Sequence, residues 1–174
     1  MADVTLSSRT MIRPYKSRSG SPRIITPPVA STRASTAAIT PGVVVQFDLT
    51  STSHHKIIRC SSGVATALLS TTIAGIAAQG EDTSVTDGPI SVWAADNNTE
   101  FIFPTKIAGT ASSLVGQPFA ICWDSTLNIN YAAPSTAGGT EAIWVTEVIN
   151  AGDTNGSIVG RFFSTRVSPS VWTR

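Results

Sequence analysis

Short apolar runs separated by polar turns follow one another along the chain from residue 43 onward. Residues 127–131 alternate strictly between apolar and polar positions, which predicts a β-strand with one buried face. Further runs of apolar and β-branched residues predict strands at 43–49, 56–60, 73–78, 89–94, 100–103, 119–123, 142–149 and 157–165. No segment shows convincing helical periodicity, although residues 64–69 and 110–115 could each form one helical turn. We therefore expect an all-β protein, a compact β-barrel or β-sandwich of about 8–10 short strands.

Turn residues predict two hairpins and one irregular strand. The last four predicted strands form two pairs, the first around a polar turn at 124–126 and the second around a loop at 152–156 that is rich in Gly, Asp and Asn. Gly75 lies inside an otherwise apolar strand, which indicates either a bulge or the close approach of another backbone segment.

Charge divides the chain near residue 34. Residues 1–33 hold six of the twelve basic side chains and a single acid, so they carry a net charge of +5, whereas residues 34–174 carry −4. Four prolines oppose helix formation in the basic part and favour an extended chain. We therefore divide the protein into an extended, basic, Ser- and Pro-rich N-terminal arm of residues 1–35 and an all-β body of residues 36–174, which we expect to fold without the arm.

The arm is the segment that physical reasoning most clearly connects to a partner. Its cations suit either phosphate groups or an acidic protein surface. Tyr15 is its only aromatic residue, so base stacking is not expected as the main mode and nucleic acid is not the expected partner. A disordered solubilising tail is the alternative, and the apolar side chains of the arm argue against it. The candidate partner-binding residues are Arg9, Ile12, Arg13, Tyr15, Lys16, Arg18, Arg23, Ile24 and Ile25. Residues 24–26 could add a short strand to the partner or to the body.

Residues that could carry chemistry show no pattern of a catalytic, cofactor or metal site. His54 and His55 are the only histidines, and adjacent residues on a strand point to opposite faces, so they cannot easily share one metal. Cys60 and Cys122 match no metal spacing and are interpreted as buried free thiols. Neither a nucleophile elbow nor a phosphate-binding glycine loop is present. We expect no enzyme, no cofactor and no metal.

No stretch of the chain predicts a membrane span or a secretory leader. The sequence contains no apolar run of about 18 residues, the length that a spanning helix requires. The basic residues at the N-terminus are not followed by an apolar segment. We therefore expect synthesis in the cytoplasm, which agrees with two unpaired thiols.

Turns and small apolar strands occur at 41–44 (PGVV), 75–78 (GIAA), 90–92 (ISV), 100–101 (EF), 114–116 (LVG), 153–157 (DTNGS) and 161–162 (RF). In this pattern, from about residue 40 to residue 165, the chain resembles the capsid decoration (cement) proteins of tailed bacteriophages. The resemblance implies a structural virion protein with a small β-barrel or β-sandwich fold. Such a protein is made in the host cytoplasm and binds the major capsid protein on the outer surface of an icosahedral head, where it stabilises contacts between neighbouring subunits.

The resemblance further implies that the arm is the docking element and that the protein is a homotrimer. A trimer would present several arms at once and would raise avidity without any new contact.

Two other functions stay open. A self-assembling viral coat protein also joins a basic, genome-facing arm to a β body. A glycan- or host-binding β module would need an exposed aromatic residue beside a polar loop, and Trp93 with Asp96, Asn97 and Asn98 is the candidate for such a site.

Overall fold

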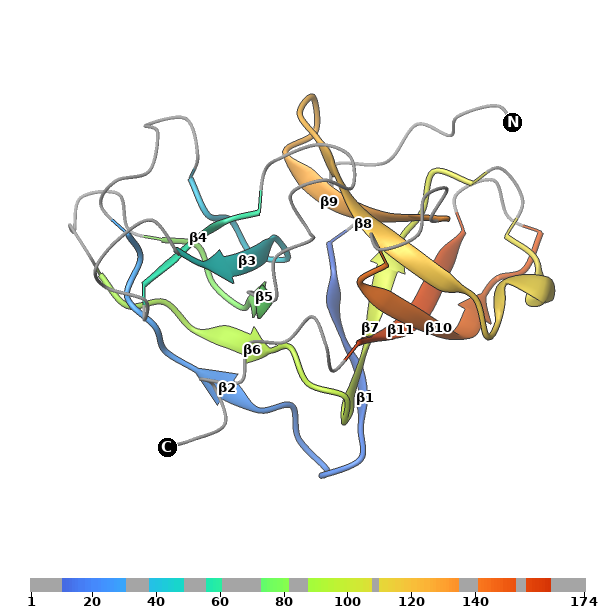
Figure 1. Cartoon of the computed structure of the whole chain (residues 1–174), viewed down its shortest axis with the longest axis horizontal. Helices are drawn as coiled ribbons and strands as arrows, with labels where there is room; N and C mark the ends of the chain where they lie inside the picture. The colour runs from blue at the N-terminus through green and yellow to red at the C-terminus, as the bar shows by residue number, and fades with distance from the viewer. Residues whose placement is uncertain are drawn as a thin grey trace.

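The protein is built from two antiparallel β-sheets, as the computed structural model shows (Figure 1). The structure describes residues 11–30, 38–48, 56–60, 73–81, 88–107, 110–134, 141–152 and 156–163. The six-stranded sheet has the order β1 (Arg13–Ser17), β7 (Thr99–Pro104), β11 (Ser157–Phe162), β10 (Ile143–Ile149), β8 (Pro118–Asp124) and β9 (Ile129–Pro134). The five-stranded sheet has the order β2 (Ile24–Ile25), β6 (Val92–Ala94), β5 (Ile73–Ala77), β3 (Val44–Phe47) and β4 (Ile57–Arg59).

The predicted all-β class is therefore confirmed, and the two sheets make the molecule sandwich-like rather than a closed barrel. The predicted helical turn at 110–115 is the short 3-10 helix η2 (Ser112–Leu114), whereas the one at 64–69 lies outside the described residues. Within the described part of the chain, no helix is long and apolar enough to cross a membrane.

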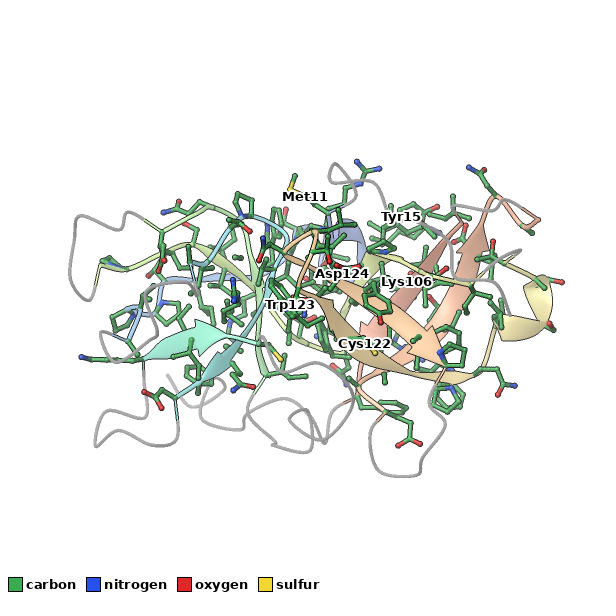
Figure 2. All side chains as sticks on the ribbon, turned by 90° about the horizontal axis from the view of Figure 1, so that it is seen from above. Met11, Tyr15, Lys106, Cys122, Trp123 and Asp124 are labelled. Atoms are coloured by element: carbon green, nitrogen blue, oxygen red, sulfur yellow. The ribbon has the colours of Figure 1, made fainter. Side chains whose placement is uncertain are left out.

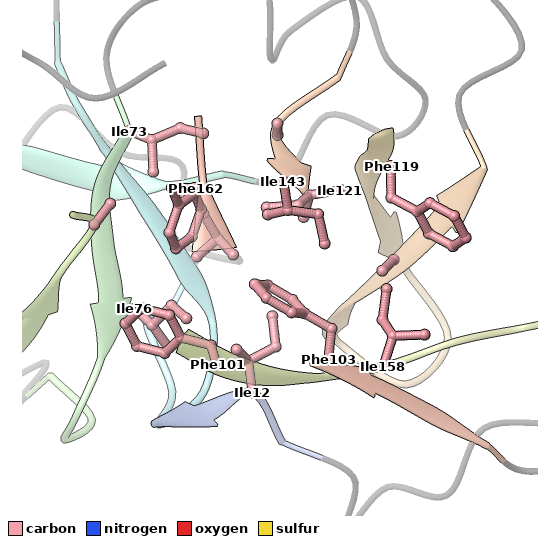
Figure 3. Close-up of a cluster of buried hydrophobic side chains, with 14 of the residues drawn as sticks. Ile12, Ile73, Ile76, Phe101, Phe103, Phe119, Ile121, Ile143, Ile158 and Phe162 are labelled. Carbon is pink, nitrogen blue, oxygen red and sulfur yellow. The ribbon is translucent and has the colours of Figure 1, made fainter. Parts of the chain in front are cut away.

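Aromatic and branched side chains from both sheets form the main core (Figure 3). On β7 the burial alternates, so that Phe101 and Phe103 point inward. Their rings meet Phe162 of β11 edge to face, with centroids 5.6 and 5.9 Å apart, a favourable aromatic geometry. Ile73 and Ile76 of the five-stranded sheet belong to the same cluster. The core is therefore shared by the two sheets, which makes them one folding unit.

The five-stranded sheet is buried on both faces, because a second apolar cluster that includes Val45, Ala74 and Val92 lies apart from the main core. Every residue of β5 is buried. A Cβ atom added at Gly75 would collide with the carbonyl oxygen of Trp93 on the neighbouring strand, and the register between β3 and β5 shifts at this point. Both features predicted for Gly75, the close approach and the bulge, are present.

The two predicted hairpins are confirmed as β8–β9 and β10–β11. In the first, the Asp124 carboxylate accepts hydrogen bonds from the backbone N–H groups of Thr126 and Leu127, and Asn128 has a positive φ of 55°. This chemistry is typical of Asp and Asn in tight turns. The loop of the second hairpin is described only in part, because residues 153–155 lie outside the described ranges.

A buried amide joins the two sheets. The side-chain oxygen of Asn130 on β9 accepts a hydrogen bond from the Val44 N–H at 2.8 Å, and its nitrogen donates to the carbonyls of Cys60 and Cys122 at 3.2 and 3.3 Å. The prediction for residues 127–131 is wrong in two respects. The strand begins at Ile129, because residues 127–128 lie in the turn, and the face toward the core carries Asn130 and Ala132 in place of the alternating apolar residues. The three hydrogen bonds offset the cost of burial, since buried polar groups are strongly destabilising only when they are unsatisfied.

Residues 11–30, which we call the N-terminal ribbon, supply the edge strand of each sheet (Figure 1). β1 pairs with β7, and β2 pairs with β6, so residues 24–25 add a strand to the body. Ile12 is 1% exposed and belongs to the main core, and Val29 and Ala30 are also buried. Pro28 and Ala30 hydrogen-bond with the backbone of Ile57 on β4. The predicted boundary at residue 35 stays a prediction, but residues 11–30 pack as part of both sheets.

Gly42 leaves room for the ribbon to pack closely against the turn before β3. Its φ of +82° suits a residue without a side chain, and an added Cβ atom would lie 2.6 Å from the Cβ of Met11 and 3.2 Å from the backbone nitrogen of Ile12. The chain at Met11 and Ile12 therefore passes directly over this glycine, which lies in the turn before β3.

Candidate functional site

The surface of the N-terminal ribbon combines apolar and basic side chains. Met11, Tyr15 and Ile24 are 49%, 39% and 57% exposed, and they are three of the five large hydrophobic residues that are exposed in the described ranges. The ribbon also carries four cations and no acid. Tyr15 lies on β1 and Ile24 on β2, so the exposed apolar residues of the ribbon occur on the edge strands of both sheets.

The structure separates the predicted partner-binding residues into two groups. Ile12 is buried in the core, Ile25 is half-buried against the second apolar cluster, and Arg23 is half-buried and has a partner of its own. Arg9 lies outside the described residues. Of the predicted residues, those that are exposed are Arg13, Tyr15, Lys16, Arg18 and Ile24.

Glu147 of β10 holds two of these exposed side chains in place. Lys16 Nζ lies 2.9 Å from one carboxylate oxygen of Glu147, and the Tyr15 hydroxyl donates to the other at 3.3 Å. The hydrogen bond to Glu147 raises the pKa of Lys16, and the same bond lowers the pKa of Glu147. Because the pair is exposed, it orients these groups more than it stabilises the fold. No local pattern in the sequence indicates this contact, which joins residues 131 positions apart.

Arg13 and Arg18, two other cations of the ribbon, have no such side-chain contact among the described residues. The side chains of Arg13 and Arg18 are exposed, and no residue in the described ranges forms a side-chain hydrogen bond or ion pair with either of them. They are therefore available to an acidic partner surface.

The edge strand β1 carries three features that oppose pairing with another strand. Pro14 lacks a backbone N–H group, the register with β7 shifts between Pro14 and Lys16, and the flanking Arg13 and Lys16 are charged. Proline, bulges and charges are the devices with which natural edge strands avoid edge-to-edge association. A partner would therefore contact the ribbon through its side chains rather than by extending the sheet.

A second polar cluster lies where β8 and β9 meet the end of β7, and it was not predicted from the sequence (Figure 2). Lys106 Nζ lies 2.7 Å from the Asp124 carboxylate and 4.7 Å from the centre of the Tyr131 ring. The hydrogen bond from Lys106 lowers the pKa of Asp124. The ion pair links Lys106, which follows β7, to the end of β8, and both side chains are largely shielded from solvent.

Both cysteines are free and buried, as the sequence predicts. Burial raises the pKa of Cys60 to about 12, and burial also raises the pKa of Cys122, which packs beside Tyr131. Both thiols therefore stay protonated near neutral pH, and a protonated thiol is a poor nucleophile and a poor metal ligand.

The residues proposed from the sequence for a glycan site do not form an exposed platform. Trp93 is half-buried and packs against the main core. Asp96 is buried, and its carboxylate accepts hydrogen bonds from the backbone N–H groups of Asn98 at 3.0 Å and Thr99 at 2.6 Å. Asp96 therefore holds the turn between β6 and β7. Of this set, Asn97 and Asn98 are exposed.

The described residues contain no cluster of metal-binding groups. Across these ranges, no three His, Cys, Asp or Glu side chains lie close enough to hold a metal ion together. The two histidines lie outside the described residues.

The fold and the ribbon surface define an all-β, sandwich-like protein whose sheet edges carry a mixed apolar and basic surface. Comparison with protein-family models, with curated proteins and with solved structures finds no match to this chain.

Proposed function

We propose that the protein is a decoration (cement) protein of a phage head. In this role it binds the outer surface of an icosahedral capsid and stabilises contacts between neighbouring subunits of the major capsid protein. The observation that carries the proposal is the N-terminal ribbon, which presents Met11, Tyr15 and Ile24 along the edges of both sheets. It also presents Arg13 and Arg18, whose side chains have no partner among the described residues. The resemblance of residues 40–165 to decoration proteins supports the same function.

The chemistry of the ribbon suits a protein partner. Aromatic residues, Met and Arg are enriched in protein–protein interfaces, and all three occur on this surface. Because residues 11–30 are already ordered by the two sheets, docking would cost less conformational entropy than docking of a free arm. A homotrimer would present three such surfaces and would convert a modest single contact into a strong one.

The oligomeric state of the isolated protein tests the class of function. We expect size-exclusion chromatography with light scattering to give a small oligomer, a trimer above all, with an absorbance ratio that shows no nucleic acid. Very large particles that carry nucleic acid would contradict the proposal and would favour the self-assembling coat protein.

Point variants test the surface itself, with heads of the encoding virus that lack the protein as the binding partner. We expect Ile24→Asp to weaken co-sedimentation with these heads at least about tenfold, the loss typical of a residue at the centre of an interface. Val115→Asp is the matched control, because Val115 is similarly exposed but lies beside η2. Unchanged binding of the Ile24 variant would refute docking through the ribbon. An equal loss in the Val115 variant would show that the loss is not specific to the ribbon, and it would contradict the proposed docking surface.

A further inference from the structure

An open pocket of about 220 Å³ lies where the turn between β6 and β7 meets β10 and β11. It is lined by Asn97, Trp144, Arg161, Phe162 and Phe163. Trp144 and Arg161 are direct cross-strand neighbours, so both side chains leave the sheet on the same face. None of the exposed ribbon residues of the proposed docking surface lines this pocket.

Three different kinds of group meet in this pocket. Trp144 is 37% exposed, and the ring of Phe163 packs edge to face against it with centroids 5.8 Å apart, which holds the indole in one orientation. Arg161 forms no side-chain hydrogen bond or ion pair with any residue in the described ranges. Asn97 is exposed and adds an amide that can both donate and accept. A flat apolar face thus lies beside an unpaired cation and a neutral polar group.

The size and chemistry of the pocket restrict what it can bind. Pockets for drug-sized ligands usually occupy about 300–1,000 Å³, so this one has room for a single ring. A pyranose has one apolar C–H face and a polar rim of hydroxyl groups, which matches an indole face flanked by Asn97. The planar guanidinium of Arg161 adds a preference for a carboxylate, to which it can donate two parallel hydrogen bonds.

We propose that this pocket binds one acidic sugar ring, a pyranose that carries a carboxylate. The ring stacks on Trp144, its carboxylate pairs with Arg161, and its hydroxyl groups hydrogen-bond with Asn97. The mouth of the pocket is open, so the ring can be the terminal unit of a longer polysaccharide. A ligand of this size binds with a dissociation constant of about 1 mM or weaker, and display of several copies on one particle would raise the avidity. This activity goes beyond capsid binding and does not depend on it.

The test is a titration of the full-length protein, without heads, by NMR. D-glucuronate is the probe, D-glucose is the neutral control and acetate is the carboxylate without a ring. We expect saturable shifts of the Trp144 indole and Arg161 side-chain signals with glucuronate, binding at least about tenfold weaker with glucose because the charge-assisted pair is lost, and no saturable shift with acetate.

Variants separate the roles of the two main residues. Trp144→Ala should abolish binding of both sugars, whereas Arg161→Gln should remove the preference for glucuronate and leave weak ring binding. Arg18→Gln, which removes an exposed arginine of the ribbon, is the matched control and should change nothing. Each variant should keep the unfolding midpoint of the native protein, since the Trp144 and Arg161 side chains lie outside the main core.

Three results would overturn the proposal. The first is no saturable shift with glucuronate up to about 50 mM, well above the expected dissociation constant. The second is equal binding of glucuronate and glucose that Arg161→Gln does not change. The third is saturable binding of a short acidic peptide, acetyl-Glu-Phe-Glu-amide, in place of glucuronate, which would make the pocket a contact for a protein segment.

Discussion

Truncation of Ile12 tests whether the N-terminal ribbon is an integral edge of the fold or a free arm. Ile12 is 1% exposed and belongs to the cluster that contains Phe101, Phe103 and Ile76 (Figure 3). The substitution Ile12→Ala removes buried carbon atoms and leaves a cavity in that cluster, because the surrounding side chains are held by both sheets. If the ribbon were a free arm, this side chain would be in water in the folded and unfolded protein alike.

The expected cost follows from burial. Replacing a fully buried isoleucine with alanine costs about 2–5 kcal/mol, from lost hydrophobic transfer and from the cavity. For a domain of this size, that loss lowers the unfolding midpoint by about 5–15 °C. Ile24→Ala is the matched control, because Ile24 lies on the same ribbon and is 57% exposed. We expect this second variant to stay within about 0.5 kcal/mol of the native protein.

The measurement is thermal and urea-induced unfolding of the native protein and of both variants, followed by circular dichroism and tryptophan fluorescence. If the unfolding free energy falls with urea concentration at the same slope in all three proteins, the difference in midpoint reports stability. A different slope would mean that unfolding exposes a different amount of surface. An Ile12→Ala variant with the native midpoint would refute the reasoning, and so would equal losses at Ile12 and Ile24. The native midpoint in Ile12→Ala would restore the free arm that the charge pattern predicts.

Two further variants test the interior of the sheets and the polar cluster. Gly75→Ala should abolish stable folding, because the added Cβ atom would collide with the Trp93 carbonyl oxygen. Gly20→Ala is the control and should cost only about 1 kcal/mol, since Gly20 has a positive φ but open space around it. Solubility and unfolding midpoints of both variants are the measurements. The pKa of Asp124 is lowered in the folded state by Lys106, so its contribution to stability is present above about pH 4 and is lost as the pH falls through the folded-state value. The difference in unfolding free energy between the native protein and Asp124→Asn should therefore shrink from about pH 7 to about pH 3, and a constant difference would contradict this role of the ion pair.

Strand positions were predictable because burial and turn chemistry are local. The runs around Val44 and Phe101 become strands, and both hairpins form around the turns that their Asp, Asn and Gly residues indicate. The prediction for Gly75 succeeded for the same reason, since a glycine weakens a strand interior and is typical of a bulge or of a close backbone approach there. The two cysteines, which match no metal spacing, are free and buried as the sequence analysis predicted.

Long-range pairing was not predictable in the same way. The contacts of Glu147 with Tyr15 and Lys16 join segments that nothing in the local sequence connects. The tryptophan nearest Asn97 along the chain is Trp93, but the tryptophan that lines a pocket with Asn97 is Trp144. Sequence proximity therefore does not show which tryptophan lies beside Asn97, because strand order brings distant residues together.

The sequence by itself determined an all-β protein with two hairpins, buried thiols and an N-terminal segment rich in cations. Only the tertiary structure decided that this segment forms the edge of both sheets, that Ile12 lies in the core, and that Asn130 joins the sheets. The physical reason is that burial is a property of the whole packing. An apolar residue in a basic, proline-rich segment has the same sequence pattern whether the segment binds a partner or packs on its own body. Here each sheet has an edge whose backbone groups can pair with this segment, and that pairing places the segment on the body.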